Sequence, residues 1–351
     1  MANYKVGFDV HKKYTQIAVL NESGQVCEQR RLEHSPESVC DYLQRFPGGT
    51  PVAFETVGNW YWIATAIEAA GCVPLLTHAA KAKVMMGNVN KTDKLDAQGL
   101  ATLLHLGKLP TVWIPPAELR DERELLRTRM HLSKVRTGLK NRIHASLAKY
   151  ALQVEGSDIF SGQGYARLHR KILELPPQTY ACVVEELELL ERVQTQIAQL
   201  EKHIQDTLQD TPAVKLLQSL PGFGKIFSAL VAQEMGPAER FPDAEHFASY
   251  AGCVPRVSSS GGKSHYGHLR REANPYLKWA FLEAANGIAS HRQLATWSSK
   301  HVIRLYERTR QRKGHAVAVG AVARHLAEAA YWLLRKNQSY REPPTDLPRQ
   351  A

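Results

Sequence analysis

Four acidic residues in the first hundred positions have the types and spacing of a metal-binding cluster. Asp9 ends the apolar run KVGFD, Glu55 ends the run PVAFE, and Asp93 and Asp96 stand three residues apart on an expected helix. Four carboxylates that converge on one cleft repel one another unless divalent cations neutralise them. Mg²⁺ (or Mn²⁺) is the expected ion, because it takes carboxylate oxygens and leaves positions for water and phosphate. Such a site predicts phosphoryl transfer.

The spacing of the acids also allows a simpler interpretation, which the residues alone favour. Asp9 could cap a turn, and the Asp93 and Asp96 pair could be the solvated start of a helix. His11 is expected to be a turn residue rather than a ligand. The aromatic residues at 60–62 could stack a nucleic-acid base, but core packing is the expectation for them.

Three consecutive serines before two glycines are the second candidate for chemistry. Ser258, Ser259 and Ser260 precede Gly261, and cationic side chains follow over 263–271. A serine oxygen that attacks a phosphodiester needs such positive charge, together with a metal or base that takes its proton. A flexible Ser/Gly loop with basic residues for phosphate contact explains the same composition and is favoured by composition alone.

The chain is basic, which favours a polyanionic partner. It has 45 Lys and Arg residues against 34 Asp and Glu residues, a net charge of +11, and a long basic helix is expected over 118–152. The motif PGFG before an apolar helix has the shape of a helix-hairpin-helix, in which glycines at positive φ turn backbone N–H groups toward a phosphate. The residues predicted to contact nucleic acid are Lys12, Arg123, Arg127, Lys134, Arg136, Lys140, Arg142, Gly222, Gly224, Lys225, Lys263, Arg270 and Arg271.

Other classes of protein fit the sequence poorly. The longest apolar segments are interrupted by His, Lys or Arg within about 18 residues, the length that a membrane span needs. The beginning of the chain has no apolar signal-peptide core. The five cysteines are scattered without CxxC pairing, so we expect reduced thiols, a cytoplasmic location and no zinc site.

Residues 1–112 are expected to form an α/β domain. A β-hairpin at 4–20 carries Asp9 on its first strand. The elements expected after it are a strand within 25–34, a helix over 35–46, a strand at 51–55, a helix at 59–70, a strand at 72–76 and a helix from residue 92. Strands that form a hairpin and then alternate with helices indicate a mixed sheet covered on both faces.

The rest of the chain is expected to be all-α, after a proline-rich linker near 108–117. It divides into a long helical and coiled-coil region at 113–210, a mostly helical domain at 211–338 and a disordered tail at 339–351. A heptad seam at 183–208 fits an antiparallel helical hairpin within the chain and a dimerising coiled coil equally well. The other expected elements are a weakly patterned stretch at 156–164, an irregular segment at 254–272 and helices at 275–290, 294–311 and 315–336.

Five short motifs resemble those of one family when they are taken together. The motifs GFDVHK, AFETVGNWYW, NKTDKLDA, PGFG and SSGGK look like those of the insertion-sequence transposases of family one-hundred-and-ten. These are the DEDD recombinases, which include the pilin-inversion recombinases. The resemblance covers about residues 4–335. It strongly favours a metal site at the four acids over the simpler interpretation of a turn cap and a solvated helix start.

The resemblance implies a RuvC-like N-terminal domain of the RNase H fold, with Asp9, Glu55, Asp93 and Asp96 as its four acids. It implies a helical coiled-coil connection and a C-terminal transposase domain whose serine is the nucleophile. Ser260 is the expected nucleophile, because it directly precedes the two glycines, and Ser259 is the second choice. The resemblance also implies a phosphoserine intermediate, DNA as substrate and a structured noncoding guide RNA. It further implies a homo-oligomer, a dimer or tetramer, in which the acids of one subunit meet the serine of another.

One departure and three alternatives accompany this resemblance. Where the family often has a lysine-arginine-glycine-asparagine run, this chain reads RREAN at 270–274, so the glycine is replaced. A RuvC-like junction nuclease that uses water is the enzymatic alternative, and a non-catalytic architectural protein is the alternative from another class. An actin-like ATPase is disfavoured, because His11 and Lys12 replace the phosphate-loop glycine.

Overall fold

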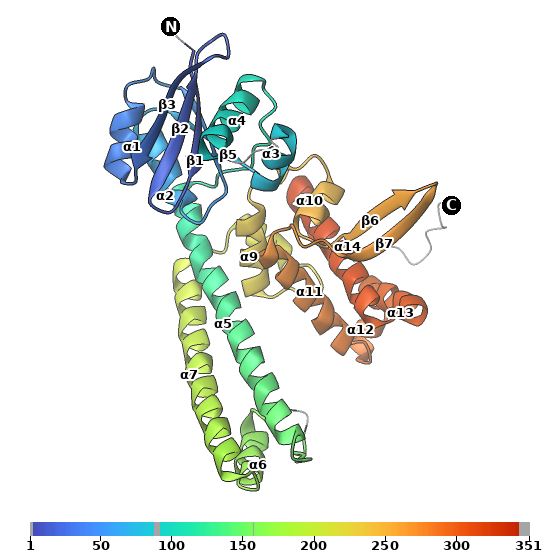
Figure 1. Ribbon diagram of the computed structural model, residues 1–351. Coiled ribbons are helices and arrows are strands. Elements are labelled where there is room, and N and C mark those ends of the chain that lie inside the picture. Colours follow the sequence, from blue (N-terminus) through green and yellow to red (C-terminus); the bar gives the residue numbers. More distant parts are fainter. Residues whose placement is uncertain (1–2, 88–91, 157, 344–351) are drawn as a thin grey trace. The chain divides into compact units, whose positions relative to one another are not determined.

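The computed structural model describes residues 3–87, 92–156 and 158–343 (Figure 1). The chain divides into two compact units, unit 1 at residues 1–115 and unit 2 at residues 116–351. The regions expected at 113–210 and 211–338 fall almost entirely within unit 2. The first two residues of the motif NKTDKLDA and the end of the expected tail, residues 344–351, lie outside the described residues.

Unit 1 contains a five-stranded mixed sheet. Its strands are β1 (Lys5–Val10), β2 (Tyr14–Leu20), β3 (Val26–Glu33), β4 (Pro51–Glu55) and β5 (Val73–Thr77). The strand order is β3-β2-β1-β4-β5. β3, β2 and β1 pair antiparallel, whereas β1, β4 and β5 pair parallel. The hairpin and the three later strands therefore form where the sequence predicts them.

Helices cover both faces of this sheet, as expected. α1 (Pro36–Leu43) and α2 (Trp60–Ala69) share one apolar core with the side chains of Phe8 and Phe54. α3 (Ala79–Met86) and α4 (Asp93–His105) share the core on the opposite face, around Ala53. α3 was not predicted, because AAKAKVMM has only a weak helical pattern and a single buried residue, Ala82.

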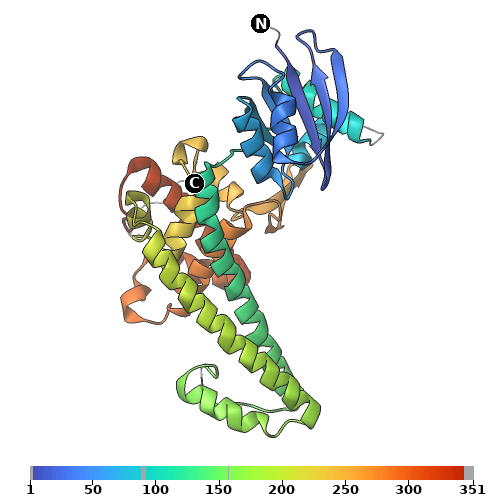
Figure 2. The same ribbon diagram turned by 90° about the vertical axis from the view of Figure 1, so that its left-hand side faces the viewer.

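Two long helices form an antiparallel pair in unit 2. α5 (Ala117–Ala148) lies along α7 (Pro177–Thr207), and the short helix α6 (Gly162–Ile172) lies at the turn between them (Figures 1 and 2). The seam of α7 is buried in the cores that the two helices share. Its buried residues are Leu190, Val193, Ile197 and Ile204. Of the two interpretations of the heptad pattern, the antiparallel hairpin within the chain is therefore the one that forms.

The remainder of unit 2 is mostly helical and surrounds one large core. Its helices are α8 (Pro212–Leu217), α9 (Lys225–Met235), the 3-10 helix η1 (Ala238–Arg240), α10 (Ala244–Tyr250), α11 (Pro275–Ser290), α12 (Ala295–Ser298), α13 (His301–Lys313) and α14 (His315–Lys336). Phe247, Phe281 and Leu326 are fully buried in this core. The helix expected at 294–311 is two helices, because the chain leaves the helical conformation at Lys300.

The segment expected to be irregular at 254–272 is largely a β-hairpin, so that prediction was wrong. β6 (Pro255–Ser260) and β7 (Lys263–Leu269) pair antiparallel. Gly261 and Gly262 have φ angles of 56° and 75°. Two consecutive residues at positive φ make the tight turn that favours two-residue hairpins. A Gly-Gly pair between two short runs was the sequence signal for this turn.

Two further observations bear on expectations from the sequence. No helix in the described ranges is long and apolar enough to cross a membrane. The start of the expected tail is held in place rather than disordered. The backbone N–H of Tyr340 donates to Ser219 at 2.8 Å, and Glu342 accepts from the N–H of His301 at 2.8 Å.

Candidate active site

The parallel pairing of β1 with β4 places two of the predicted acids at the same level of the sheet. Phe8 lies opposite Phe54 in this pairing, and Asp9 and Glu55 are the next residue of each strand. Because side chains alternate along a strand, both acids point away from the face that buries the two phenylalanines. They lie on the face that α4 covers, at the carboxyl ends of neighbouring parallel strands.

A glycine lets α4 approach this end of β1. A Cβ atom on Gly7 would lie 2.1 Å from the carbonyl oxygen of Ala97 and 2.7 Å from the backbone nitrogen of Ala101. No larger residue fits there, because real Cβ contacts are longer. The approach brings the first turn of α4, with Asp93 and Asp96, toward Asp9. Gly7 begins the motif GFDVHK, but sequence reasoning gave it no role of its own.

Asp9 and Asp93 meet through a histidine. The Nε2 atom of His11 lies 2.9 Å from Oδ2 of Asp9 and 3.3 Å from Oδ2 of Asp93. One ligand atom of each of these three residues lies within 4.8 Å of the other two. His11 stands in the turn after β1, as expected, but its side chain belongs to the acidic cluster. Asp96 and Glu55 lie outside this tightest group of the described residues.

Tyr14 is a second member of the cluster that the sequence did not indicate. Its hydroxyl donates to Oδ2 of Asp93 at 2.8 Å, and its ring stacks on His11 with centroids 4.5 Å apart. The guanidinium of Arg31 lies 3.7 Å from the centroid of the Tyr14 ring. The hydrogen bond to Asp93 raises the pKa of Tyr14, so the hydroxyl keeps its proton and remains a donor.

The electrostatics of Asp9 fit a bound cation. Its side chain is only 16% exposed, and burial is the main cause that raises the pKa of Asp9 above its ordinary value. Contact with His11 acts in the opposite direction, whereas the charges of Asp96 and Asp93 raise the pKa further. A divalent cation would offset both the burial and the repulsion. The donor set of carboxylates, with one imidazole beside them, therefore suits an ion such as Mg²⁺ or Mn²⁺.

The serine run lies on the exposed hairpin at the end of β6. Ser260 pairs with Lys263, Ser259 with Ser264 and Ser258 with His265. Directly opposed residues share a face of the hairpin, and neighbours along a strand alternate between faces. Ser258 and Ser260 therefore lie on one face with Lys263, while Ser259 lies on the other. The two candidate nucleophiles, Ser260 and Ser259, therefore lie on opposite faces of the hairpin.

The basic pair after the hairpin leads into the N-terminus of α11. Arg270 and Arg271 are exposed, and Arg270 donates to the hydroxyl of Ser249 at 2.8 Å. Asn274 caps α11 by accepting from the backbone N–H groups of its first turn at 3.0 and 3.1 Å. The asparagine of the RREAN run thus has a structural role at this helix start.

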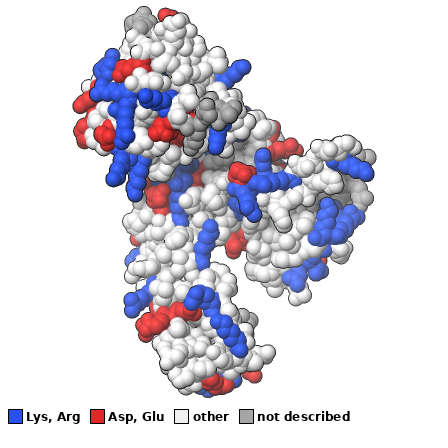
Figure 3. All heavy atoms as spheres, viewed as in Figure 1, with Lys and Arg blue, Asp and Glu red and all other residues white. Residues whose placement is uncertain are grey.

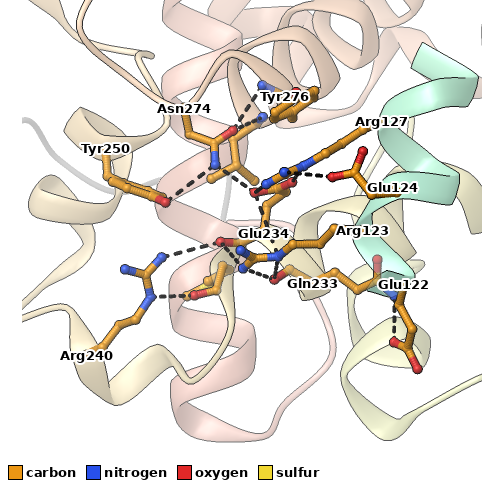
Figure 4. Close-up of polar contacts among 12 residues, drawn as sticks. Glu122, Arg123, Glu124, Arg127, Gln233, Glu234, Arg240, Tyr250, Asn274 and Tyr276 are labelled. Atoms are coloured by element: carbon orange, nitrogen blue, oxygen red, sulfur yellow. Dashed lines mark hydrogen bonds and ion pairs between the residues drawn. The ribbon is translucent and has the colours of Figure 1, made fainter. Parts of the chain in front are cut away.

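Arg123 and Arg127 were predicted to contact nucleic acid, but their side chains donate hydrogen bonds to groups within the protein (Figure 4). Arg127 donates to both carboxylate oxygens of the fully buried Glu234, at 2.7 and 3.2 Å. Arg123 is 5% exposed and donates to the backbone carbonyl of Gln233 at 3.1 and 2.5 Å. Asn274 donates to Glu234 at 2.9 Å. This network ties α5 and α9 to the start of α11.

The other residues predicted on the basic helix differ in their surroundings. Lys134 is exposed and Arg136 is half-buried. Arg142 lies 2.6 Å from Glu186 on α7, and Lys140 lies 3.8 Å from Asp158. The Lys140 pair is on the surface, and surface pairs contribute little to stability.

The remaining predicted contacts are on loops and turns. Lys12 is exposed in the turn after β1. Gly222 has a φ of 78°, as expected, but Gly224 is extended and precedes α9 as its N-cap, so the expectation of positive φ was wrong for Gly224. The ammonium of Lys225 lies 3.4 Å from Asp210.

Two family models match this chain. The model described as "Transposase", of the DEDD type of IS110, matches residues 6–152. The model described as "Transposase IS116/IS110/IS902 family" matches residues 214–301. The first match contains the four predicted acids, and the second contains the serine hairpin.

Two curated relatives match along almost their whole length. "Probable family 20 transposase" of Pseudomonas aeruginosa is 26% identical over 346 residues, which are 96% of this chain and 98% of that protein. "Transposase for insertion sequence element IS1111A" of Coxiella burnetii is 24% identical over 344 residues, 96% of this chain and 91% of that protein. The similarity therefore extends over both units.

Proposed function

Because this chain belongs to the IS110 family of transposases, we propose that it is a DNA recombinase that exchanges strands through a serine–DNA intermediate. The observation that carries the proposal is the meeting of Asp9 and Asp93 around His11 at the end of β1. Strand order and covering helices are consistent with the RNase H fold, so we assign unit 1 as the RuvC-like domain.

The acids Asp9, Glu55, Asp93 and Asp96 would hold Mg²⁺ or Mn²⁺, which when bound neutralises charge on the scissile phosphate. Tyr14 keeps Asp93 oriented through its hydrogen bond. Lys12, which is exposed in the same turn as His11, would contact the DNA backbone. Gly7 keeps α4 close enough for the acids of two elements to act on one phosphate.

Ser260 is the nucleophile in this proposal. Its Oγ gives up its proton and forms a bond to phosphorus while one P–O ester bond of the DNA backbone breaks, and the leaving oxygen takes up a proton and departs as the hydroxyl of the other strand end. The phosphoserine bond conserves the energy of the phosphodiester, so rejoining to a new strand needs no ATP. Lys263, which pairs with Ser260, and Arg270 and Arg271 near the base of the hairpin, supply positive charge for the phosphate.

The family resemblance also supports two partners. We propose that a structured noncoding RNA pairs with donor and target DNA. In this proposal the protein acts in the cytoplasm as a dimer or tetramer, in which the acids of one subunit meet the serine of another. The exposed Lys134 and the exposed Gly222 turn of the PGFG motif provide surface for the nucleic-acid backbone.

The test is covalent capture of DNA. Purified protein is incubated with Mg²⁺, element-end DNA and RNA transcribed from the flanking noncoding region, and the products are resolved under denaturing conditions. Ser260→Ala is expected to lose the protein–DNA adduct, and the neighbouring Ser259→Ala is expected to keep it. An adduct that survives in Ser260→Ala would remove this serine from the mechanism.

The same experiment separates the two alternatives. A RuvC-like nuclease that uses water would cleave the DNA without any adduct. An architectural protein would bind DNA equally well with Mg²⁺ and with EDTA, and would not cleave it. Asp9→Asn is expected to lose the adduct while it retains RNA binding, because Asp9 serves the metal site and not the RNA surface.

A further inference from the structure

A groove beside the serine hairpin carries an unusual concentration of positive charge. It lies between β7 and the helices α11, α13 and α14, with a volume of about 810 Å³. Its cationic residues are Arg271, Lys278, Arg308, Arg312, Lys313 and Arg324. Among the described residues that line this groove there is no Asp or Glu. Lys and Arg side chains also gather on the C-terminal helical lobe in the space-filling view (Figure 3).

Much of this charge has no counter-charge in the described protein. Arg308, Arg312 and Lys313 are exposed and have no ion pair with any described carboxylate, whereas their neighbour Arg310 pairs with Glu307 at 2.9 Å. Arg324 does have partners, Glu328 at 2.6 Å and Glu245 at 3.6 Å. Like charges that crowd one groove repel each other, so the arrangement favours an anionic occupant.

The floor of the groove is apolar. It is lined by Ala316, Val317, Gly320 and Ala321 of α14, and the side chain of Val317 is 49% exposed. A duplex presents phosphates outward and keeps its sugars and bases largely inside. A single strand offers sugar and base faces to an apolar floor together with phosphates for a cationic rim. The groove volume is that of a site for a small ligand, which suits a few nucleotides of one strand.

The hairpin register relates this groove to one serine. Gly267 lines the groove, and Lys263 and His265 precede it at two-residue steps on the same face of β7. Ser260 is opposite Lys263, so it lies on that face. The Val257 and Tyr266 pair, which lies on the opposite face, lines a different pocket, whose charged residues are Glu245, Glu272, Arg256, Arg270 and Arg324.

We propose that this groove binds single-stranded DNA, namely the strand that continues from the phosphodiester attacked by Ser260. The inference rests on the proposed function only for the identity of the attacked strand. Phosphates lie along Arg308, Arg312 and Lys313, and sugars and bases lie on the α14 floor. The strand then follows β7 toward the hairpin turn.

The test measures binding without chemistry. In a Ser260→Ala background, a short fluorescent single-stranded DNA is titrated at several salt concentrations, with RNA and duplex DNA of the same sequence as competitors. The double variant Arg308→Gln, Arg312→Gln is expected to bind single-stranded DNA about 10-fold more weakly, with a salt slope smaller by about 1.4, which is about 0.7 for each lost phosphate contact. Arg308→Lys, Arg312→Lys is expected to restore most of the affinity.

The matched control is the double variant Arg192→Gln, Arg310→Gln. It removes the same net charge from unit 2, from exposed positions that do not line the groove. Equal losses in the groove variant and in this control would overturn the proposal, as would an effect confined to RNA or to duplex DNA. Adduct formation is measured separately, in protein that retains Ser260. If the groove variant loses binding of single-stranded DNA, but protein with Ser260 and the native groove forms no adduct, the groove proposal is supported and the assignment of Ser260 as nucleophile is refuted.

Discussion

The Nε2 atom of His11 lies 2.9 Å from Oδ2 of Asp9, two residues before it on the chain. The same nitrogen is 3.3 Å from Asp93, which is far away in sequence. The turn after β1 therefore places an imidazole between two acids of different elements. Any cation that binds Asp9 and Asp93 must share their oxygens with His11 or replace it, so the stability of unit 1 is linked to metal binding.

Asp9→Asn is expected to stabilise the metal-free protein. The pKa of Asp9 in the folded protein lies above its ordinary value of 3.8, mainly because of burial. The folded state therefore holds this proton more tightly than the unfolded chain, and the free energy of unfolding rises as pH falls through this window. Asparagine imitates the protonated form. The melting temperature in EDTA at pH 7 should therefore rise.

Two comparisons complete this experiment. Mg²⁺ should raise the melting temperature of the native sequence and leave that of Asp9→Asn unchanged, because the variant lacks one ligand. Asp41→Asn, at an exposed position on α1, should change neither value. A lower melting temperature for Asp9→Asn in EDTA would show that its charge stabilises the fold.

Gly7→Ala is expected to abolish strand cleavage and to destabilise unit 1. The added methyl group would lie 2.1 Å from the carbonyl oxygen of Ala97, so α4 must move away from β1. Overpacking of this kind costs about 1 to 3 kcal/mol. Urea unfolding and the adduct assay measure the two effects. Gly138→Ala on α5, where nothing lies within 4 Å, should instead stabilise by about 0.5 to 1 kcal/mol and keep the activity.

Glu234→Gln is expected to destabilise unit 2 strongly. Glu234 is fully buried and accepts from Arg127 and Asn274, so its loss takes a buried carboxylate away from the half-buried Arg127 guanidinium, whose other ion pair is with the exposed Glu124. Breaking a buried pair in this way costs about 3 to 5 kcal/mol. Urea unfolding of Glu124→Gln, which removes the exposed partner of Arg127, should show a loss below about 1 kcal/mol. Similar losses in the free energy of unfolding for both variants would contradict a dominant contribution from the Arg127 and Glu234 pair.

His325 is expected to make unit 2 less stable in mild acid. Burial and the neighbouring charge of His301 lower its pKa from 6.5 to about 4. The unfolded chain therefore binds the proton between these values and the folded protein does not, so stability is lost as pH falls from 6.5 to about 4. The loss is at most about 3 kcal/mol.

Unfolding of His325→Gln by urea at a series of pH values isolates this contribution. The variant should lose less stability across the window than the native sequence does. His265→Gln, at an exposed position on β7, should behave as the native sequence. If the free energy of unfolding fell with pH as steeply in His325→Gln as in the native sequence, the acid sensitivity would come from other groups.

Local patterns were sufficient for much of unit 1. Short apolar or alternating runs predicted four of the five strands, and the segment at 25–34 was expected to supply the other one. Ser35 before Pro36 predicted the start of α1, where the serine accepts from the backbone of Ser38. The same kind of reasoning missed α3, whose weak pattern buries only Ala82. It also missed the β6–β7 hairpin, because nearly all of its residues are exposed and no apolar face marks its strands.

The sequence by itself determined the family resemblance, the strands of unit 1 and the positions of the four acids along the chain. These follow from motif residues and from periodicities that each segment carries alone. Only the tertiary structure decided that α5 covers the seam of α7, that Arg123 and Arg127 face Glu234, and that His11 joins Asp9 and Asp93. A local pattern encodes which side of a segment is apolar or charged. It does not encode which distant surface meets that side, because that depends on how all the elements pack together.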